Sequence, residues 1–243
     1  MKHIHRFFLN ERLSSGQTVR LSSDDTFHAA RVLRLRTGDR LELADGDGRA
    51  FMASVTQVGG SVETLVGDEI PAQPKEAFAV TVAQAVPKGK KMDLVVEKLS
   101  EIGVGVLAPV YTDGSVARLK PGGGEKLERW RRIARSSAGQ SRRGTVMEVA
   151  EPVAFKDWLA SWDGALIVLA TEIEATPLGD AAEGIEAPLA LLVGPEAGFS
   201  EEEVRRLQER NATFASLGKL VLRTETAALV SAAIVMHRLG RLG

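Results

Sequence analysis

Alternating apolar and polar residues mark the first part of the chain. A two-residue period is typical of strands with one buried face. It runs over residues 17–21, 40–43, 50–58 and 61–66. The segment 44–48, Ala-Asp-Gly-Asp-Gly, favours a hairpin turn because Gly and Asp tolerate a positive φ. Residues 23–35 instead place apolar side chains at nearly helical spacing behind a Ser/Asp cap. The pattern predicts a small β-rich unit with one helix.

Beyond residue 72 the period changes. Pro71 and Pro74 break regular structure, so we place a domain boundary there, with one domain over residues 1–72 and a second over 73–243. Apolar runs then alternate with segments of helical period, which predicts an α/β domain with a largely parallel sheet. We expect strands at 78–86, 104–110, 165–171, 189–193 and 214–217, and helices at 92–103, 125–140, 155–162, 201–210 and 224–239.

The composition excludes several classes of chemistry. The 243 residues include no cysteine, which removes disulfides, thiolate metal sites and a cysteine nucleophile. The four histidines have no His-x-x-x-His spacing, so we expect no metal. We expect a cytoplasmic protein without a membrane partner, because the sequence shows neither a signal-peptide core nor an apolar stretch of about 18 residues. Aromatic residues make up 5%, too few for a platform that stacks several bases.

The near-zero net charge of -1 hides a segregation of charge. Residues 85–146 carry 13 basic and 6 acidic residues, whereas residues 147–216 carry 4 basic and 14 acidic ones. Because a polyanion binds to the local patch and not to the sum, a nucleic-acid partner stays open. Arg131, Arg132 and Arg135 form a stripe on one predicted helix, and guanidinium groups chelate phosphate oxygens. The alternative is an ordinary solvated helix face.

One glycine motif is misleading. Residues 103–108, Gly-Val-Gly-Val-Leu-Ala, match the dinucleotide-binding pattern, but they follow a helix and enter a strand. The true fingerprint follows a strand and opens a helix, which counts against an oxidoreductase of Rossmann type.

Two strand-to-helix passages near the C-terminus carry more specific signals. At Gly194 a strand ends, and Ser200 with Glu203 forms a capping box before the next helix. Such turns at the carboxyl ends of parallel strands bind ligands in α/β proteins, although a plain connection has the same pattern. In the second passage, Thr224 is a candidate cap, and Glu225 in the first helical turn is either structural or catalytic.

Arg223 stands out beside this second helix start. A cation there opposes the helix dipole, so we expect a ligand or an ion partner for it.

The chain resembles the RsmE family, SPOUT-superfamily methyltransferases that methylate N3 of a uridine in 16S ribosomal RNA. The motifs that carry the resemblance are His5-Arg6-Phe7-Phe8, residues 28–35 (HAARVLRL), residues 98–104 (KLSEIGV), Gln140-Ser141-Arg142-Arg143, the Gly194–Ser200 turn, and residues 222–227 (LRTETA). The family usually has Gly where this chain has Ala197, Glu where it has Gly139, and Pro where it has Met147. Ala197 raises the question of a positive φ at that position. Gly139 removes a carboxylate near Arg143.

The resemblance implies a PUA-like β-barrel domain that binds RNA, followed by a SPOUT domain with a parallel sheet, a deep trefoil knot and S-adenosylmethionine as cofactor. It also implies a homodimer that acts on the small ribosomal subunit. The cofactor residues it implies are Ala170, Thr171, Glu172, Val193, Gly194, Pro195, Glu196, Leu217, Gly218, Leu222, Thr226 and Ala227. The expected RNA-binding residues are Arg6, Arg31, Arg34, Lys88, Lys90, Lys91, Arg131, Arg132, Arg135 and Arg142.

The chemistry then needs alignment and no metal, because the sulfonium supplies the electrophile. N3 of uridine carries a proton that must leave, and a cation near O2 or O4 would stabilise the resulting anion. We assign the cation to Arg223, with Arg143 second, and name Glu225 or Glu196 as general base. The absence of cysteine excludes the Cys-adduct route to a pyrimidine carbon. The alternatives are a non-catalytic RNA-binding or ribosome-assembly protein, and a SPOUT enzyme acting on another RNA site.

Overall fold

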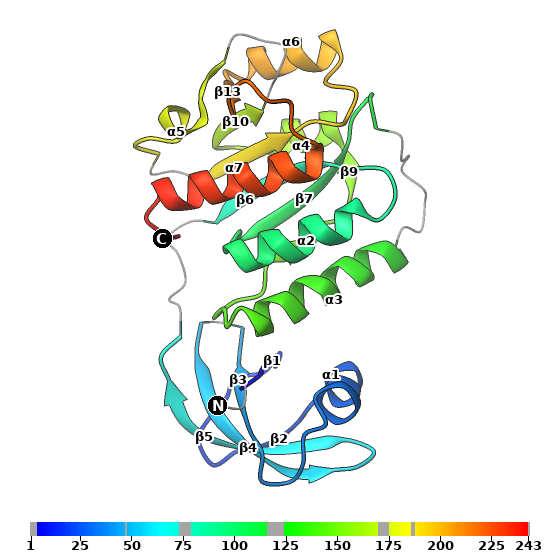
Figure 1. The fold of residues 1–243 in the computed structure, drawn as a ribbon, viewed down its shortest axis with the longest axis vertical. Coiled ribbons are helices and arrows are strands. Elements are labelled where there is room, and N and C mark those ends of the chain that lie inside the picture. Colours follow the sequence, from blue (N-terminus) through cyan, green and yellow to red (C-terminus); the bar gives the residue numbers. More distant parts are fainter. Residues whose placement is uncertain are drawn as a thin grey trace. The chain divides into compact units, whose positions relative to one another are not determined.

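The computed structural model describes residues 4–46, 48–72, 79–115, 124–169, 175–185 and 188–242. The chain forms two units, coloured along the sequence in Figure 1. The first comprises Met1–Glu76 and Ala138–Val146, and the second comprises Ala77–Ser137 and Met147–Gly243. The predicted boundary after residue 72 stays a prediction, since residues 73–78 lie outside the described residues. The segment 138–146 joins the first unit from far along the chain.

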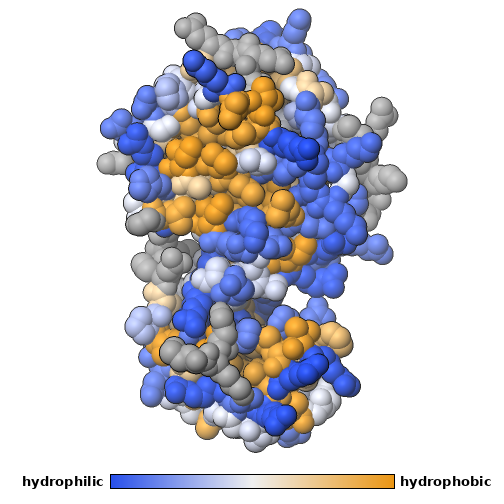
Figure 2. Space-filling view, in the orientation of Figure 1, coloured by the Kyte–Doolittle hydropathy of each residue, from blue (hydrophilic) through white to orange (hydrophobic). Residues whose placement is uncertain are grey.

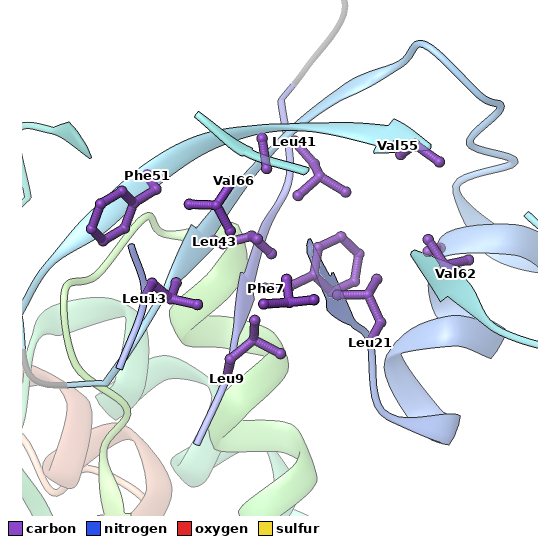
Figure 3. Packing of buried hydrophobic residues seen from close by; sticks show 13 residues of the cluster. Phe7, Leu9, Leu13, Leu21, Leu41, Leu43, Phe51, Val55, Val62 and Val66 are labelled. Atoms are coloured by element: carbon purple, nitrogen blue, oxygen red, sulfur yellow. The ribbon is translucent and has the colours of Figure 1, made fainter. Parts of the chain in front are cut away.

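The first unit is built on a five-stranded sheet. The strand order is β1 (Arg6–Phe8), β3 (Arg40–Ala44), β4 (Ala50–Val58), β5 (Val62–Ile70) and β2 (Thr18–Arg20). β1 pairs parallel to β3, and the other pairs are antiparallel. Apolar residues from these strands fill one core, in which Phe7, Leu43 and Val66 point toward one another (Figure 3). The alternating pattern therefore predicted β2 to β5 correctly. It did not predict β1, because all three residues of that strand are buried and show no alternation of apolar and polar positions.

The expected helix over 23–35 is two shorter elements. Helix α1 (Ser23–Phe27) begins after Ser22, whose hydroxyl accepts the N–H of Asp25. A π-helical turn, η1 (His28–Val32), follows it directly. In this turn the N–H of Leu33 donates to the carbonyl of His28 at 2.9 Å, five residues back.

Arg6 ties residues 138–146 to the first unit. Its buried guanidinium pairs with the buried carboxylate of Glu42, through Nε and Nη2, each at 2.9 Å. Its Nη1 donates to the carbonyls of Arg142 and Arg143 at 2.7 and 2.8 Å. A side-chain carbon at Gly139 would lie only 2.4 Å from the Arg6 carbonyl oxygen. Gly139 therefore has a steric role in this chain, since an added side-chain carbon would meet the Arg6 carbonyl at this approach.

A small apolar cluster completes this attachment. Ala138 packs with Phe8, Ala44 and Ala50, and the partly buried Ile70, Ala72 and Val146 cover the cluster.

The second unit has an eight-stranded sheet whose pairings, among the described residues, are all parallel. The strand order is β11 (Thr176–Pro177), β13 (Thr213–Ser216), β10 (Ala165–Leu169), β12 (Leu189–Val193), β6 (Val80–Ala85), β7 (Val106–Tyr111) and β8 (Glu148–Val149), with β9 (Val153–Ala154) also paired to β7. The predicted α/β domain with a parallel sheet is confirmed. The buried central strands β12 and β6 are near-continuous apolar runs.

Helices cover this sheet. They are α2 (Lys91–Ile102), α3 (Gly124–Gln140), α4 (Phe155–Ser161), α5 (Leu178–Ala181), α6 (Glu201–Glu209) and α7 (Thr224–Arg238). α2 and α7 pack against each other, as Figure 1 shows. Phe155 and Trp158 of α4 share a core with Leu192 of β12 and Leu207 of α6. α2 ends at Gly103, which has φ 101, so the misleading glycine motif is a helix C-cap.

None of these helices, within the described ranges, is both long and apolar enough to span a membrane.

Candidate functional site

The carboxyl ends of β6 and β12 are joined to the start of α7 by a buried hydrogen-bond relay. The Thr224 hydroxyl donates to the Gly194 carbonyl at 2.8 Å and accepts from the Gln84 side-chain amide at 2.9 Å. Gln84 also donates to the Ala85 carbonyl at 2.8 Å. Because the Thr224 proton is used on Gly194, the NH₂ group of Gln84 must face Thr224. Its Oε1 is then a buried acceptor with no hydrogen-bond partner among the described residues.

This relay corrects the prediction that Thr224 caps α7. Arg223 occupies the N-cap position, without a side-chain cap bond, and Thr224 is the first helical residue. The Thr224 hydroxyl is unavailable as a cap because it is bonded to Gly194, 30 residues away in the chain.

A lysine and two carboxylates lie beside the relay. The Lys91 ammonium lies 3.0 Å from Glu196 Oε1 and 3.3 Å from Glu225 Oε2. Its interactions with Glu196 and then Glu225 raise the pKa of Lys91. Burial alone would raise the pKa of Glu196, but the Lys91 hydrogen bond and backbone N–H groups hold it below its ordinary value. Glu225 is nearly buried, and its Oε2 has a charge partner but no hydrogen bond of good geometry within the described part of the chain.

The turn after β12 is held rigidly. Ser200 and Glu203 form the predicted capping box, with the Ser200 N–H donating to Glu203 Oε2 at 2.9 Å. The other oxygen of Glu203 accepts the N–H of Asp113 at 2.9 Å, which fixes the loop after β7 against this turn. Gly198 takes the positive φ, 76°, and Ala197 has none, so the turn tolerates the alanine. Gly194 lies so close to the Phe199 ring that a side-chain carbon would approach it to 2.9 Å.

The loop between β13 and α7 is open. Leu220 and Val221 are 78% and 83% exposed, and Gly218 has φ 103. Arg223 is exposed, and no described residue forms an ion pair with it. It is therefore an exposed cation without an ion partner among the described residues, and the ligand expected from its place at a helix start stays a prediction.

The predicted cofactor residues that the structure describes lie at this edge of the sheet, because parallel strands end on the same side. Ala170, Thr171 and Glu172 lie outside the described residues. Val193 and Pro195 are buried, Gly194, Leu217, Leu222 and Ala227 are half-buried, and Glu196, Gly218 and Thr226 are exposed.

The side chains predicted to contact RNA fall into two groups: those that are exposed, and those that already bind other groups of the protein. Arg31, Arg34, Lys88, Lys90, Arg132 and Arg142 are exposed. Arg131 is exposed but pairs with Glu128 at 2.9 Å, and Arg135 is half-buried and already engaged. Arg6 is buried with its donors occupied, and the charge of Lys91 is matched by two carboxylates. The structure therefore argues against a phosphate contact for Arg6 and Lys91.

The two arginines predicted to be catalytic fall in different units. Arg143 is buried in the first unit, where burial lowers its pKa to about 10, whereas Arg223 is exposed in the second. Sequence reasoning also missed Gln84 and Asp113. Gln84 had a signal, since it is the one amide within the apolar run Val80–Ala85.

Two family models match the chain. One, described as an RNA methyltransferase domain, matches residues 74–236, and the other, an RNA methyltransferase PUA domain, matches residues 21–61. The ribosomal RNA small subunit methyltransferase E of Mycobacterium bovis is 33% identical over 232 residues, covering 93% of this chain and 88% of the relative. That of Bacillus subtilis is 26% identical over 255 residues, covering 97% of each chain.

Two solved structures are similar over nearly their whole length. The methyltransferase E of Neisseria gonorrhoeae bound to S-adenosyl methionine has a TM-score of 0.87 and 31% identity, covering 97% of this chain and 98% of that one. A Legionella pneumophila methyltransferase in complex with SAM has a TM-score of 0.90 and 27% identity, with the same coverage. Together with the family models, these matches confirm the resemblance: the chain belongs to the RNA methyltransferase family that includes the ribosomal RNA small subunit methyltransferases E.

Proposed function

We propose that the protein transfers a methyl group from S-adenosylmethionine to N3 of a uridine in 16S ribosomal RNA, within the small ribosomal subunit. The observation that carries this proposal is the juxtaposition at one sheet edge of Glu225, Lys91 and the strand ends at Gly194. The membership in the RNA methyltransferase family and the relatives solved with the cofactor support it.

The residues at this edge fit the proposed cofactor. Leu217, Leu222 and Ala227 offer half-buried apolar groups for an adenine and a methionine chain. Gly218, with its positive φ, leaves backbone groups open to a close ligand. When bound, S-adenosylmethionine supplies the methyl group as an electrophile on its sulfonium. The deep trefoil knot, which the family resemblance implies for this domain, is part of the proposal.

Side chains of the protein would then deprotonate the uridine and stabilise the resulting anion. Glu225 accepts the N3 proton, and Lys91 holds its carboxylate in place. Arg223, exposed at the N-cap of α7, stabilises the anion that forms on O2 or O4. Arg223 is favoured over Arg143 in this role because the Arg143 side chain is buried whereas that of Arg223 is exposed.

We also propose that the active protein is a cytoplasmic homodimer. Val230 of α7 and Leu94 of α2 are exposed apolar residues on two helices that pack together. Figure 2 shows hydrophobic surface gathered over this part of the second unit. Leu220 and Val221 add two exposed apolar side chains in the adjoining loop. Exposed apolar area of this kind is typical of a protein interface.

The test is methyl transfer to small subunits from a strain that lacks the modification, read as 3-methyluridine by nucleoside mass spectrometry with the site mapped. Glu225→Gln and Arg223→Gln should each lower kcat by about 100-fold or more. Arg205→Gln, an exposed charge on α6, is the matched control. Methylation of a different atom or a different RNA would overturn the assignment. Calorimetry that gives no heat with S-adenosylmethionine would favour a non-catalytic RNA-binding protein.

Lys91 has a test of its own, because a positioning residue and an RNA contact affect different parameters. Lys91→Met should lower kcat about tenfold with KM for the subunit unchanged, and Lys91→Arg should restore most of the rate. A raised KM at unchanged kcat would instead identify Lys91 as a phosphate contact.

A further inference from the structure

Phe27 is an aromatic side chain that the fold leaves outside. It is 64% exposed, although it is the last residue of helix α1 and its neighbour Thr26 in that helix is buried. Every other phenylalanine in the described part of the first unit is in a core: Phe7, Phe8 and Phe51. Phe27 therefore contributes nothing comparable to the packing of the unit, and its ring is available to a partner.

The π-helical turn groups Phe27 with a cation. Because η1 closes its hydrogen bonds over five residues, side chains four and five positions apart lie on one face. Arg31 and Val32, both exposed, stand at these distances from Phe27. Ala29, fully buried, fixes the opposite face toward the core, and the His28 ring contacts the Phe7 ring edge-on at 6.2 Å. The exposed face is thus held by the core behind it.

Further arginines surround this face. Arg34 has φ 55, a left-handed conformation rarely taken by a side chain of this size, and it ends the turn. The Leu35 N–H then donates back to the Ala29 carbonyl at 2.9 Å. Arg36 follows and is also exposed. Two nearby carboxylates are bonded locally: Asp25 to the Ser22 hydroxyl and Asp39 to the Arg36 N–H, each within 3 Å. Asp24 stays exposed in the first turn of α1, where the helix dipole favours it.

We infer that Phe27, Arg31 and Arg34 form a stacking site for one unpaired base of an RNA strand. The Phe27 ring takes the base, and the two guanidiniums take the flanking phosphates. An aromatic ring can stack on any base, and arginines beside it attract the phosphates of the strand. A protein partner would not need these positive charges, so they favour RNA as the occupant. One ring is enough for one base, so the low aromatic content of the chain is compatible with this site. The inference deepens the proposed function and rests on its RNA substrate.

The experiment measures binding of a fluorescent single-stranded oligouridine of about 12 nucleotides, and of the same strand in a duplex, to the full-length protein. Phe27→Leu keeps an apolar side chain but removes the ring, and should weaken single-strand binding about tenfold while leaving duplex binding unchanged. Phe27→Trp should bind as tightly as the wild type or more tightly. Leu65→Ala removes an exposed apolar side chain on β5 and should change nothing.

Salt dependence, sedimentation and calorimetry distinguish an RNA site from a protein contact and from a failure of the proposed function. Arg31→Gln should reduce the slope of log affinity against log salt by about 0.7, the value for one phosphate of a single strand. Equal affinity of Phe27→Leu and the wild type would overturn the site. So would a Phe27→Leu protein that loses its oligomeric state in sedimentation, because the ring would then serve a protein contact. Calorimetry with S-adenosylmethionine tests the proposed function separately, since the Phe27 variants should bind the cofactor as the wild type does.

Discussion

Replacing Arg6 by methionine should cost the first unit most of its stability. Methionine keeps much of the apolar stem but removes every donor of the guanidinium. The carboxylate of Glu42 would be left buried and unpaired, and two backbone carbonyls, those of Arg142 and Arg143, would lose their donor. We therefore expect residues 138–146 to detach and the first unit to unfold readily.

The magnitude follows from these contacts. Breaking a buried ion pair from one side costs about 3–5 kcal/mol. Two carbonyls without a donor add about 1 kcal/mol each, for a loss of roughly 5–7 kcal/mol, close to the whole stability of a typical small domain. Adding Glu42→Leu removes the stranded charge, so the double variant should lie only about 2 kcal/mol below the wild type, the value of the two carbonyls.

The two units can be followed separately. All three tryptophans, Trp130, Trp158 and Trp162, belong to the second unit, so their fluorescence reports on it alone. Hydrogen exchange of the β3 and β4 amides, read by mass spectrometry in increasing urea, reports on the first. Arg20→Met is the control, because its ion pair with Glu63 is exposed and is worth about 1 kcal/mol at most. The reasoning is refuted if Arg6→Met costs no more than this control, or if the double variant is no more stable than Arg6→Met.

Three further predictions rest on single contacts. Gly139→Ala should destabilise the first unit by about 1–3 kcal/mol, since the added carbon would lie 2.4 Å from a backbone carbonyl oxygen. The control is Gly124→Ala, where the added carbon meets nothing and stability should not change. Equal unfolding midpoints of the two variants would contradict this prediction. The carboxyl of Glu202 should titrate at about 2 by NMR, because Arg205 and then Arg206 lower its pKa, and Arg206→Ala should move it toward the ordinary value. With a depressed pKa, its contribution to stability is present above the unfolded value and is lost as pH falls toward 2. Glu203→Gln, which weakens the capping box, should lower the free energy of unfolding by about 1 kcal/mol, and an unchanged unfolding midpoint would contradict the capping argument.

Local patterns predicted the regular part of the fold closely. The strands at residues 50–58 and 189–193 and the Ser200 capping box appear as expected, because each depends on residues near one another in the chain. The short strand β1 and the two-residue strands β8, β9 and β11 have too few residues for a period to appear. Their pairing is set by neighbours that are distant in sequence.

Basic residues were harder to interpret, because a lysine or an arginine looks the same in sequence whether it is free or paired. Arg6 pairs with Glu42, which is 36 residues away in the chain, and Lys91 pairs with Glu196, which is 105 residues away. Neither pairing leaves a local trace, so both residues were expected to contact RNA. The position of Arg223 at a helix start was predictable, because that position is itself a local signal, whereas its role stays a prediction.

The attachment of residues 138–146 to the first unit has a consequence for the synthesis of the chain. Once residues 1–72 have emerged from the ribosome, all five strands of the first sheet are outside it, yet Arg6 still lacks the carbonyls of Arg142 and Arg143. The unit cannot close until about as many residues again have emerged, including β6, α2 and β7 of the other unit. The first unit is therefore completed only after part of the second unit has been synthesised, and a gene fragment that stops after residue 72 would encode a sheet with one apolar cluster uncovered.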